Sequence, residues 1–446
     1  MVDLNSLIST SDFIVFLIFS ILGYILMRIL VFRNMDKGFY SLLKIFFLLK
    51  LASTVLMSLL TIYYWKEGDA IFYYSEGQNL IQLFKKDISN IKYLFIPLEY
   101  YQAGLNIDND LVKTYNGSGM ESSFLVSKFC ALFYFPAFGK YLLVNFFFCL
   151  LSTIAQIKLY IIILKRYPYL KKIIALCLLF MPTLLLYSTS IFKETLCLSF
   201  IGFAFYNFNQ IINKKNSLLN TFFLLLNVFL VFIVKSYVLY SFLISIFMLL
   251  FFQFTGAMYR HSLITRALLL VFLTGLFTLV IYNLDFFDTY VLSFVDTSNF
   301  YQQYYNNDFG ETSSFEIGEI ETTLGGLLKK MPVGFYTTYF RPHIWEVRKP
   351  IVLFSALESF FILSLTIWTL IKKGKYLLQL LRRDLFARLS LYYTIVLGTI
   401  IGLTTFNFGT LIRYKVPVVP FAWLFIFILF YYTPKKTDKN ISDKIG

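Results

Sequence analysis

The sequence predicts an all-α, polytopic membrane protein with about eleven transmembrane helices. Of its 446 residues, 58% are hydrophobic, 20% are aromatic and 15% are charged, whereas soluble domains hold roughly 45–50% apolar and about 25% charged residues. Apolar stretches of about 20 residues, the length that crosses a bilayer, recur along the chain. We therefore expect a single integral membrane domain over residues 1–446, with no soluble domain and no internal repeat.

The predicted spans follow one another through short connections, except at two places. They cover residues 12–33, 43–63, 138–164, 173–189, 194–212, 217–234, 236–254, 265–283, 350–371, 386–405 and 414–432. An odd number of spans places the two termini on opposite sides of the membrane.

Positive charge indicates the orientation, because Lys and Arg collect in the cytoplasmic connections of polytopic proteins. With the N-terminus outside, the inner connections and the tail at 433–446 hold 22 of the 40 basic residues. These are Arg28, Arg33, Lys37, Lys44, Lys165, Arg166, Lys171, Lys172, Lys214, Lys215, Arg260, Arg266, Lys372, Lys373, Lys375, Arg382, Arg383, Arg388, Lys435, Lys436, Lys439 and Lys444. The short outer turns hold four, namely Lys193, Lys235, Arg413 and Lys415. We expect an outside N-terminus, a retained first span and a cytoplasmic tail, so the net charge of +15 does not indicate nucleic-acid binding.

Two long connections, 64–137 and 284–349, lie on the outer side in this topology, and long loops often carry function. The first has apolar residues at helical spacing followed by Lys85, Lys86 and Asp87. This pattern predicts a helix along the membrane surface or a loop helix packed on the spans. The second is acidic and contains Gly325-Gly326, which predicts a segment that can be mobile when nothing is bound.

Charged residues cluster at the predicted outer ends of the spans, where burial in hydrocarbon would be costly. The first group is Trp65-Lys66-Glu67-Gly68-Asp69. The others are Lys193-Glu194, Lys235, Arg341 through Glu346, Glu358 within the ninth span, and Arg413-Tyr414-Lys415. Distant parts of the sequence thus supply acids and bases to one interfacial layer, where an anionic lipid headgroup would lie.

Each of these residues also has a structural interpretation. Asp69 can be a helix cap, and Lys193-Glu194 can be an internal ion pair at a hairpin tip. Lys235 can extend its ammonium group to the headgroups, and Arg413 and Lys415 can be interfacial anchors.

The cysteines and histidines do not indicate a metal centre. The four cysteines lack Cys-x-x-Cys spacing, so neither a zinc site nor a disulfide framework is expected. His343 and His261 fall on opposite predicted faces, which excludes a histidine metal site. A requirement for a divalent cation stays open.

Four short motifs, together with the layout of spans and loops, carry a family resemblance. They are Gly68-Asp69-Ala70-Ile71-Phe72-Tyr73-Tyr74, the tip from Pro182 through Ser188-Thr189-Ser190-Ile191-Phe192-Lys193-Glu194, Arg341-Pro342 through Trp345-Glu346, and Arg413-Tyr414-Lys415-Val416-Pro417 through Pro420. The chain resembles the GT-C class of membrane glycosyltransferases, of the bacterial polysaccharide-biosynthesis type. Two features depart from that class: the acidic loop follows the second span rather than the first, and Glu67 stands in for the missing partner of an Asp-Glu pair.

The resemblance implies transfer of a sugar from a polyprenyl-phosphate-linked donor to a glycan or lipid-linked acceptor, on the extracytoplasmic side of a bacterial inner (plasma) membrane. Asp69 would be the catalytic base that accepts the proton of the acceptor hydroxyl. Cations would stabilise the departing phosphate. The candidate cations are Lys193, Arg341, Arg413 and Lys415. Rings that can stack on sugars are Trp65, Tyr73, Tyr74 and Trp345. Glu67, Glu194, Lys235 and Glu346 complete the predicted substrate-binding layer.

Two other functions fit the same layout. A polymerase or ligase of lipid-linked repeat units would use the same donor and basic layer, with arginines rather than an essential Asp. A secondary transporter or a flippase for lipid-linked glycans would bind near the bilayer midplane, on broken helices related by a repeat. The sequence shows neither a repeat nor paired broken helices. Glu358, Lys50 and Lys158 are the residues that fit transport, although both lysines can snorkel inward.

Overall fold

The computed structural model describes residues 7–29, 37–95, 121–213, 217–258, 284–307 and 313–434. Over these ranges the chain is helical, and the extended pairing found there is an isolated antiparallel bridge between Ser314 and Asn407. Seven helices of the described chain are long and apolar enough to cross a membrane, or eight when one bent pair is counted as a span. The all-α, polytopic character is thus confirmed. Eleven spans remains a prediction, because residues 265–283 lie outside the described ranges.

The chain divides between Leu239 and Tyr240 into two compact units, and each is described by itself. The elements of unit 1 are α1 (Thr10–Met27), α2 (Lys37–Leu59), η3 (Leu60–Trp65), α3 (Asp69–Lys86), η4 (Ile88–Leu94), α6 (Glu121–Tyr134), α7 (Tyr141–Arg166), η5 (Pro168–Leu170), α8 (Lys171–Ala175), η6 (Leu176–Phe180), α9 (Pro182–Tyr187), α10 (Lys193–Ile212) and the first part of α11 (Ser217–Met258).

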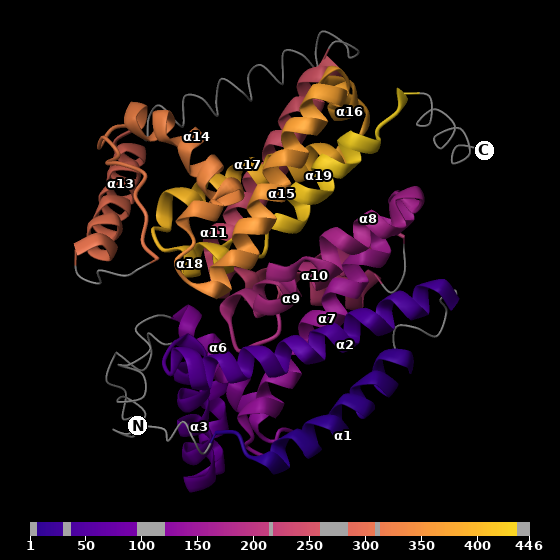
Figure 1. The fold of residues 1–446 in the computed structure, drawn as a ribbon, viewed down its shortest axis with the longest axis vertical. Coiled ribbons are helices and arrows are strands. Elements are labelled where there is room, and N and C mark those ends of the chain that lie inside the picture. Colours follow the sequence, from indigo (N-terminus) through magenta and orange to yellow (C-terminus); the bar gives the residue numbers. More distant parts are fainter. Residues whose placement is uncertain are drawn as a thin grey trace. The chain divides into compact units, whose positions relative to one another are not determined.

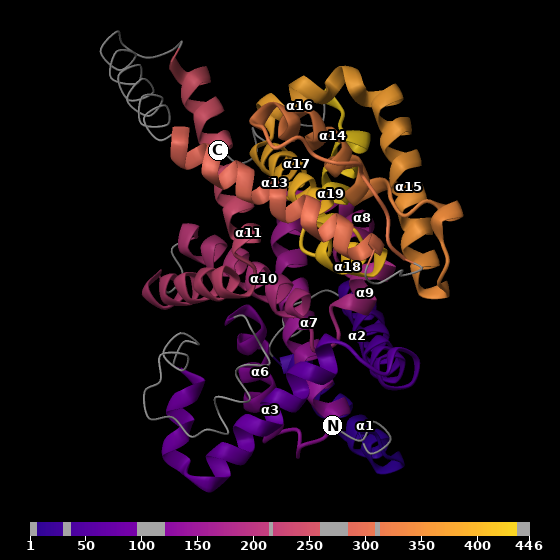
Figure 2. The same ribbon diagram turned by 90° about the vertical axis from the view of Figure 1, so that its left-hand side faces the viewer.

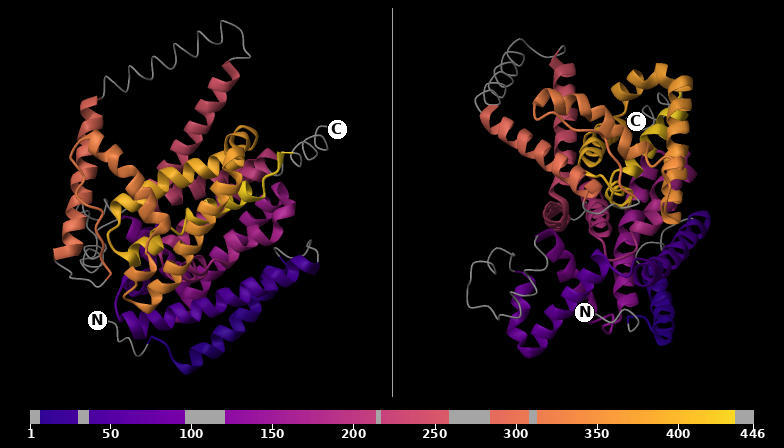
Figure 3. Two further views of the ribbon diagram at one scale, coloured as in Figure 1. Left: turned by 45° about the horizontal axis from the view of Figure 1, so that its top comes forward. Right: turned by 60° about the vertical axis from the view of Figure 1, so that its left-hand side comes forward.

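Helix α7 is central in unit 1, because α1, α2 and α10 all pack against it (Figure 1). Small residues permit the closest of these contacts: a Cβ at Gly202 of α10 would lie 2.9 Å from the carbonyl oxygen of Ala155 in α7. Helices α3 and α6 form a second pair (Figure 3). There, a Cβ at Gly77 would lie 2.6 Å from the Cβ of Cys130. Part of the predicted outer loop 64–137 is therefore a packed helical pair.

The predicted span 173–189 differs from the structure, which breaks this segment into the short elements α8, η6 and α9. Met181 is extended (φ −65°, ψ 130°) before Pro182, and a residue preceding proline is disfavoured in the helical conformation. The hydrophobicity of the segment reflects its burial rather than one continuous helix.

The predicted spans 217–234 and 236–254 are joined in the structure as α11. Its dihedral angles depart from helical at a single residue, Lys235 (φ −153°, ψ 83°). The predicted break at Lys235 is present, but it is a kink in which the side chain is buried, not an exposed hairpin tip.

Unit 2 contains the remainder of α11, α13 (Leu284–Asn307), α14 (Leu324–Phe340), η7 (Ile344–Glu346), α15 (Pro350–Lys373), η8 (Gly374–Tyr376), α16 (Leu377–Arg383), α17 (Leu385–Thr404), α18 (Phe408–Tyr414) and α19 (Val419–Tyr431). Helices α15 and α17 both pack on α19 (Figure 2). The predicted span 414–432 differs, because α18 and α19 form a bent pair with 66° between them.

The predicted outer loop 284–349 holds two helices, α13 and α14, rather than irregular chain alone. Thr323 caps α14 by accepting a hydrogen bond from the backbone N–H of Gly326 at 3.0 Å. Helix α14 packs closely on α17, where a Cβ at Gly402 would clash with the carbonyl oxygen of Gly334. The hydroxyl groups of Thr338 and Tyr339 donate to backbone carbonyls of α17, at 2.7 and 2.8 Å. Small residues that allow close backbone approach are typical of helix pairs in membranes.

Replacing Gly402 with Ala is therefore expected to destabilise unit 2, because the added methyl group meets backbone that cannot move aside. Overpacking of this kind typically costs about 1–3 kcal/mol. The thermal midpoint and the monodisperse yield of the detergent-purified protein should both fall. Gly374→Ala is the matched control, since nothing lies within 4 Å of a Cβ at that position. Equal behaviour of the two variants would contradict the close crossing of α14 and α17.

Candidate functional site

The turn between η3 and α3 presents two exposed carboxylates at the end of an apolar helix. Residues Leu60–Trp65 form a π-helix, a rare conformation that is frequent at functional sites. Lys66 then adopts a left-handed conformation (φ 58°), and Gly68 follows at φ 123°. Glu67 and Asp69 are both exposed. This segment, Lys66–Asp69, is called the acidic turn.

Asp69 is not the helix cap that the structural interpretation predicted. Gly68, not Asp69, is the N-cap of α3, and Asp69 is the first helical residue. A carboxylate in the first turn interacts favourably with the helix dipole. The Asp69 carboxylate is exposed, so a substrate can reach it from solvent.

The two tyrosines after Asp69 do not have the exposed rings that sugar stacking needs. Tyr73 and Tyr74 are buried in the face of α3 that packs within unit 1. The hydroxyl of Tyr74 donates to the carbonyl of Gly139 at 2.6 Å, and its ring lies edge-on to Tyr141. The prediction that these two rings bind substrate is corrected: at helical spacing they belong to the core.

Glu76 is a buried acid that the sequence analysis did not single out. Its side chain is 8% exposed, and its Oε2 atom has no hydrogen-bond partner in the described part of the chain. Desolvation by burial raises the pKa of this carboxyl to about 7. The available signal was an acid on the apolar face of α3, at helical spacing from Tyr73, Leu80 and Leu83.

Glu194 and Lys235 form a buried ion pair, with Lys235 Nζ 2.7 Å from Glu194 Oε1. The pair joins the first turn of α10 to the kink of α11. The neighbouring Lys193 is half-buried and donates to the Ser122 hydroxyl of α6 at 2.9 Å. The structural interpretation paired Glu194 with Lys193, whereas in the structure Glu194 pairs with Lys235. Lys235 does not extend to the headgroups, because its side chain is enclosed by protein.

A second buried network holds the non-helical turn between α9 and α10. The fully buried Lys50 donates from Nζ to the Ser152 hydroxyl at 2.9 Å, and to the carbonyl and hydroxyl oxygens of Ser188 at 2.8 and 2.7 Å. The side chain of Asn145 accepts hydrogen bonds from the Ser190 hydroxyl at 2.7 Å and the Ile191 N–H at 3.0 Å. Lys50 therefore does not snorkel, and its ammonium group fixes backbone inside unit 1.

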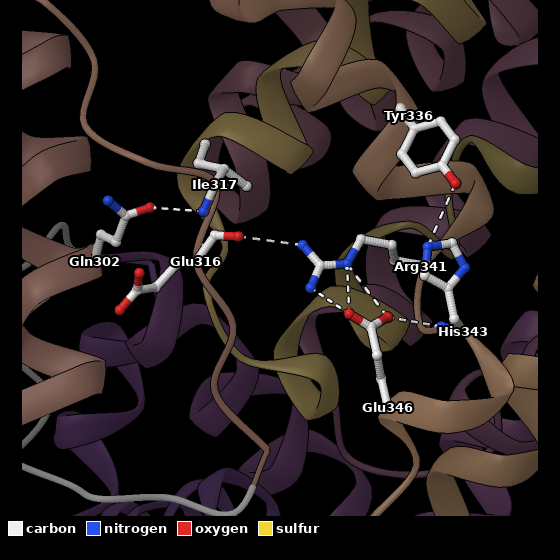
Figure 4. A network of polar contacts seen from close by, with 7 residues as sticks. All are labelled: Gln302, Glu316, Ile317, Tyr336, Arg341, His343 and Glu346. Atoms are coloured by element: carbon white, nitrogen blue, oxygen red, sulfur yellow. Dashed lines mark hydrogen bonds and ion pairs between the residues drawn. The ribbon is translucent and has the colours of Figure 1, made fainter.

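In unit 2, Arg341 is the centre of a polar and aromatic cluster (Figure 4). Its Nε donates to both carboxylate oxygens of Glu346, at 3.0 and 3.3 Å, and Nη2 also contacts Oε1. Nη1 donates to the Glu316 carbonyl at 3.3 Å. The guanidinium carbon lies 4.5 Å from the ring centre of Phe315. Burial alone would raise the pKa of Glu346, but hydrogen bonds from Arg341 and the His343 backbone lower it.

Lys415 connects to the same cluster through Ser359. The Ser359 hydroxyl donates to the carbonyl of Arg341 at 3.0 Å, and Lys415 Nζ donates to that hydroxyl at 3.4 Å. Glu358, the preceding residue of α15, interacts electrostatically with Lys415. Lys415 is 2% exposed, so the prediction of direct phosphate contact by this residue is corrected. Arg413 is half-buried and Trp345 is 81% exposed.

Within unit 2 the structure thus brings Lys415 close to Arg341 and Glu346, which lie about 70 residues earlier in the sequence. In unit 1 it brings together Glu194 and Lys235, and it exposes Glu67 and Asp69 at one turn. Among the described residues, no group of three or more His, Cys, Asp or Glu side chains can hold a metal ion.

The fold and these buried charges define an all-helical membrane protein with several apolar spans. Comparisons of the chain with protein-family models, curated protein sequences and solved structures found no match. The apolar helices place the chain in the class of polytopic membrane proteins.

The pKa of Glu76 predicts a pH dependence of stability. A carboxyl whose folded pKa is raised loses stability as the pH rises from its unfolded pKa, about 4.5, through its folded pKa, about 7. The thermal midpoint should thus fall between about pH 5 and pH 8, and Glu76→Gln should be more stable than wild type at pH 8 by about 1–3 kcal/mol. Glu67→Gln, which changes an exposed acid, should keep the wild-type pH profile. An unchanged profile in Glu76→Gln would refute the assignment.

The buried pair of Glu194 and Lys235 makes a second prediction. Lys235→Met removes the cation from a buried carboxylate and should destabilise the protein by about 3–5 kcal/mol. The double variant Lys235→Met, Glu194→Gln removes both charges and should regain much of that stability. Thermal melting of the single and double variants in detergent measures the coupling. Additive losses would show that the two side chains do not act as a pair.

Proposed function

We propose that this protein is a glycosyltransferase of the bacterial inner membrane that transfers a sugar from a polyprenyl-phosphate-linked donor to a glycan or lipid-linked acceptor. The site would face the extracytoplasmic side, with the N-terminus outside and the C-terminus in the cytoplasm, and would serve synthesis of a cell-envelope polysaccharide. The acidic turn carries this proposal. It offers exposed carboxylates directly after an apolar helix, where a lipid-linked donor would meet a water-soluble acceptor.

Asp69 is the proposed catalytic base. The acceptor hydroxyl oxygen attacks the anomeric carbon and gives its proton to the Asp69 carboxylate. The bond from the anomeric carbon to the phosphate oxygen breaks, and the lipid phosphate leaves with the electron pair. Glu67 is two residues away and equally exposed, and we assign it to hydrogen bonding with the sugar.

Positive charge stabilises the departing phosphate. The burial of each candidate cation indicates whether it can contact that phosphate. Lys235 is enclosed and paired with Glu194, and Lys415 is enclosed and donates to Ser359, so both lysines position neighbouring groups. Arg341 donates to the Glu346 carboxylate from both Nε and Nη2, an arrangement that fixes its guanidinium but occupies two of its nitrogens. In unit 1, which also holds the acidic turn, Lys193 is half-buried, and we propose it for contact with the phosphate. A polymerase or ligase of lipid-linked repeat units would use the same residues with a larger acceptor.

Transport is the second candidate, favoured by one observation that the sequence did not provide. The chain is non-helical and buried at 188–192 in unit 1, and α18 and α19 are bent in unit 2. Interrupted helices with satisfied backbone groups are typical of transporter binding sites. Flux of a lipid-linked glycan in proteoliposomes, in the absence of any transfer reaction, would favour this function over catalysis.

Asp69→Asn is expected to lower the transfer rate by about 10²–10⁴-fold, because it removes the proton acceptor while keeping the shape of the side chain. The measurement is transfer from a radiolabelled polyprenyl-phosphate-linked sugar by the purified variant, with its thermal midpoint checked separately. Asp87→Asn is the matched control, since this exposed acid caps η4 at the other end of α3 and Asn caps helices equally well. Wild-type transfer by Asp69→Asn would eliminate the catalytic role.

A further inference from the structure

Three aromatic side chains gather beside the ion pair of Arg341 and Glu346. The rings of His343 and Trp345 are stacked, with centres 4.6 Å apart and planes at 28°. The ring centre of Tyr336 lies 5.8 Å from that of His343, and its hydroxyl oxygen is 3.3 Å from His343 Nε2 (Figure 4). Trp345 is 81% exposed and Tyr336 is 41% exposed. These three residues are called the aromatic platform.

The platform is held in place by directional hydrogen bonds. The carboxylate of Glu346 accepts from the His343 backbone N–H at 2.7 Å and from the guanidinium of Arg341. This closes the short helix η7 and fixes the chain on which His343 and Trp345 lie. His343 covers one face of the indole ring, so the other face is free to receive a ligand. Trp residues that anchor a protein at a bilayer interface lie at the headgroup level because their rings are amphipathic, and this needs no hydrogen bonds that fix the backbone carrying them.

The chain that follows the platform carries cations that can meet an anionic ligand. Residues 341–350 carry three cations, Arg341, Arg348 and Lys349, and one acid, Glu346. Glu316 of the preceding segment also lies beside Arg341, which it contacts through its backbone carbonyl. The Glu346 carboxylate is already neutralised by Arg341. Arg348 is exposed, so its charge faces solvent. A ligand that combines a flat apolar face with negative charge complements this surface.

We propose that the aromatic platform binds an acidic glycan, with one pyranose ring stacked on Trp345 and its carboxylate toward Arg348. The C–H face of a pyranose is weakly positive and meets the negative face of the indole. This inference rests on the proposed transfer of a sugar, and it specifies the acceptor as a glycan that contains acidic sugars.

Fluorescence of the full-length protein in detergent tests the platform, with tetragalacturonate as the acidic probe and cellotetraose as the neutral probe. The emission difference between wild type and Trp345→Phe isolates the signal of Trp345. Tetragalacturonate should quench this signal saturably, and cellotetraose should bind more weakly. Trp345→Ala should weaken tetragalacturonate binding about 5- to 10-fold, as measured by calorimetry. Trp368→Ala is the matched control, since Trp368 is an exposed tryptophan of α15 away from the platform.

The charge is tested by Arg348→Gln, which should weaken tetragalacturonate binding about 2- to 5-fold and leave cellotetraose binding unchanged. Absence of saturable tetragalacturonate binding, or binding that Trp345→Ala leaves intact, overturns the proposal. Equal affinity for the neutral probe overturns the acidic specificity. Quenching of Trp345 by brominated lipid chains in nanodiscs would show that the ring is a bilayer anchor, and would also overturn it.

Binding is measured without a sugar donor, so the platform and the proposed transfer reaction can fail separately. Asp69→Asn should lose transfer while keeping wild-type affinity for tetragalacturonate. Loss of affinity in Trp345→Ala together with normal transfer to a neutral acceptor would leave the glycosyltransferase proposal intact and confine the platform to acceptor choice.

Discussion

Lys50 donates hydrogen bonds to Ser152 and to both oxygens of Ser188 inside an apolar helix bundle, and the non-helical turn after α9 depends on these bonds. An unsatisfied polar group in such surroundings costs several kcal/mol, so a chain that leaves the helical conformation there needs internal partners. Asn145 supplies further bonds to the same turn. The polar side chains of α2 and α7 therefore make possible the start of α10, where Glu194 meets Lys235.

The same constraint shapes unit 2 through Arg341. Its guanidinium reaches the carboxylate after α14, the carbonyl of Glu316 and the ring of Phe315, while its own carbonyl accepts from Ser359. Ser359 in turn accepts from Lys415 at the bend between α18 and α19. One planar cation with several donors can thus order segments that are far apart in the sequence. The ion pair of Arg341 and Glu346 also fixes the backbone that carries the aromatic platform, because Glu346 accepts from the His343 N–H.

The charged residues then fall into two groups by their access to water. Glu194 and Lys235 are enclosed as an ion pair, and Lys415 is enclosed with a hydrogen bond to Ser359, which suits positioning of other groups. Glu67, Asp69 and Trp345 are exposed on turns fixed by π-helical, left-handed or hydrogen-bonded backbone. Exposed groups on an ordered backbone are open to a substrate that arrives from solvent. The proposed chemistry is accordingly assigned to the second group.

The sequence by itself determined the all-helical membrane class, because about 20 apolar residues in succession have few other stable environments. It also located the break at Lys235 and the charged ends of the spans. Only the tertiary structure decided that Glu194 pairs with Lys235, that Tyr73 and Tyr74 are buried, and that Glu76 is an enclosed acid. The hydrophobicity of a segment is a sum over consecutive residues, so it can be read from the sequence without knowing which helices pack beside it. The partner and the burial of one side chain depend on helices that come together from distant parts of the chain.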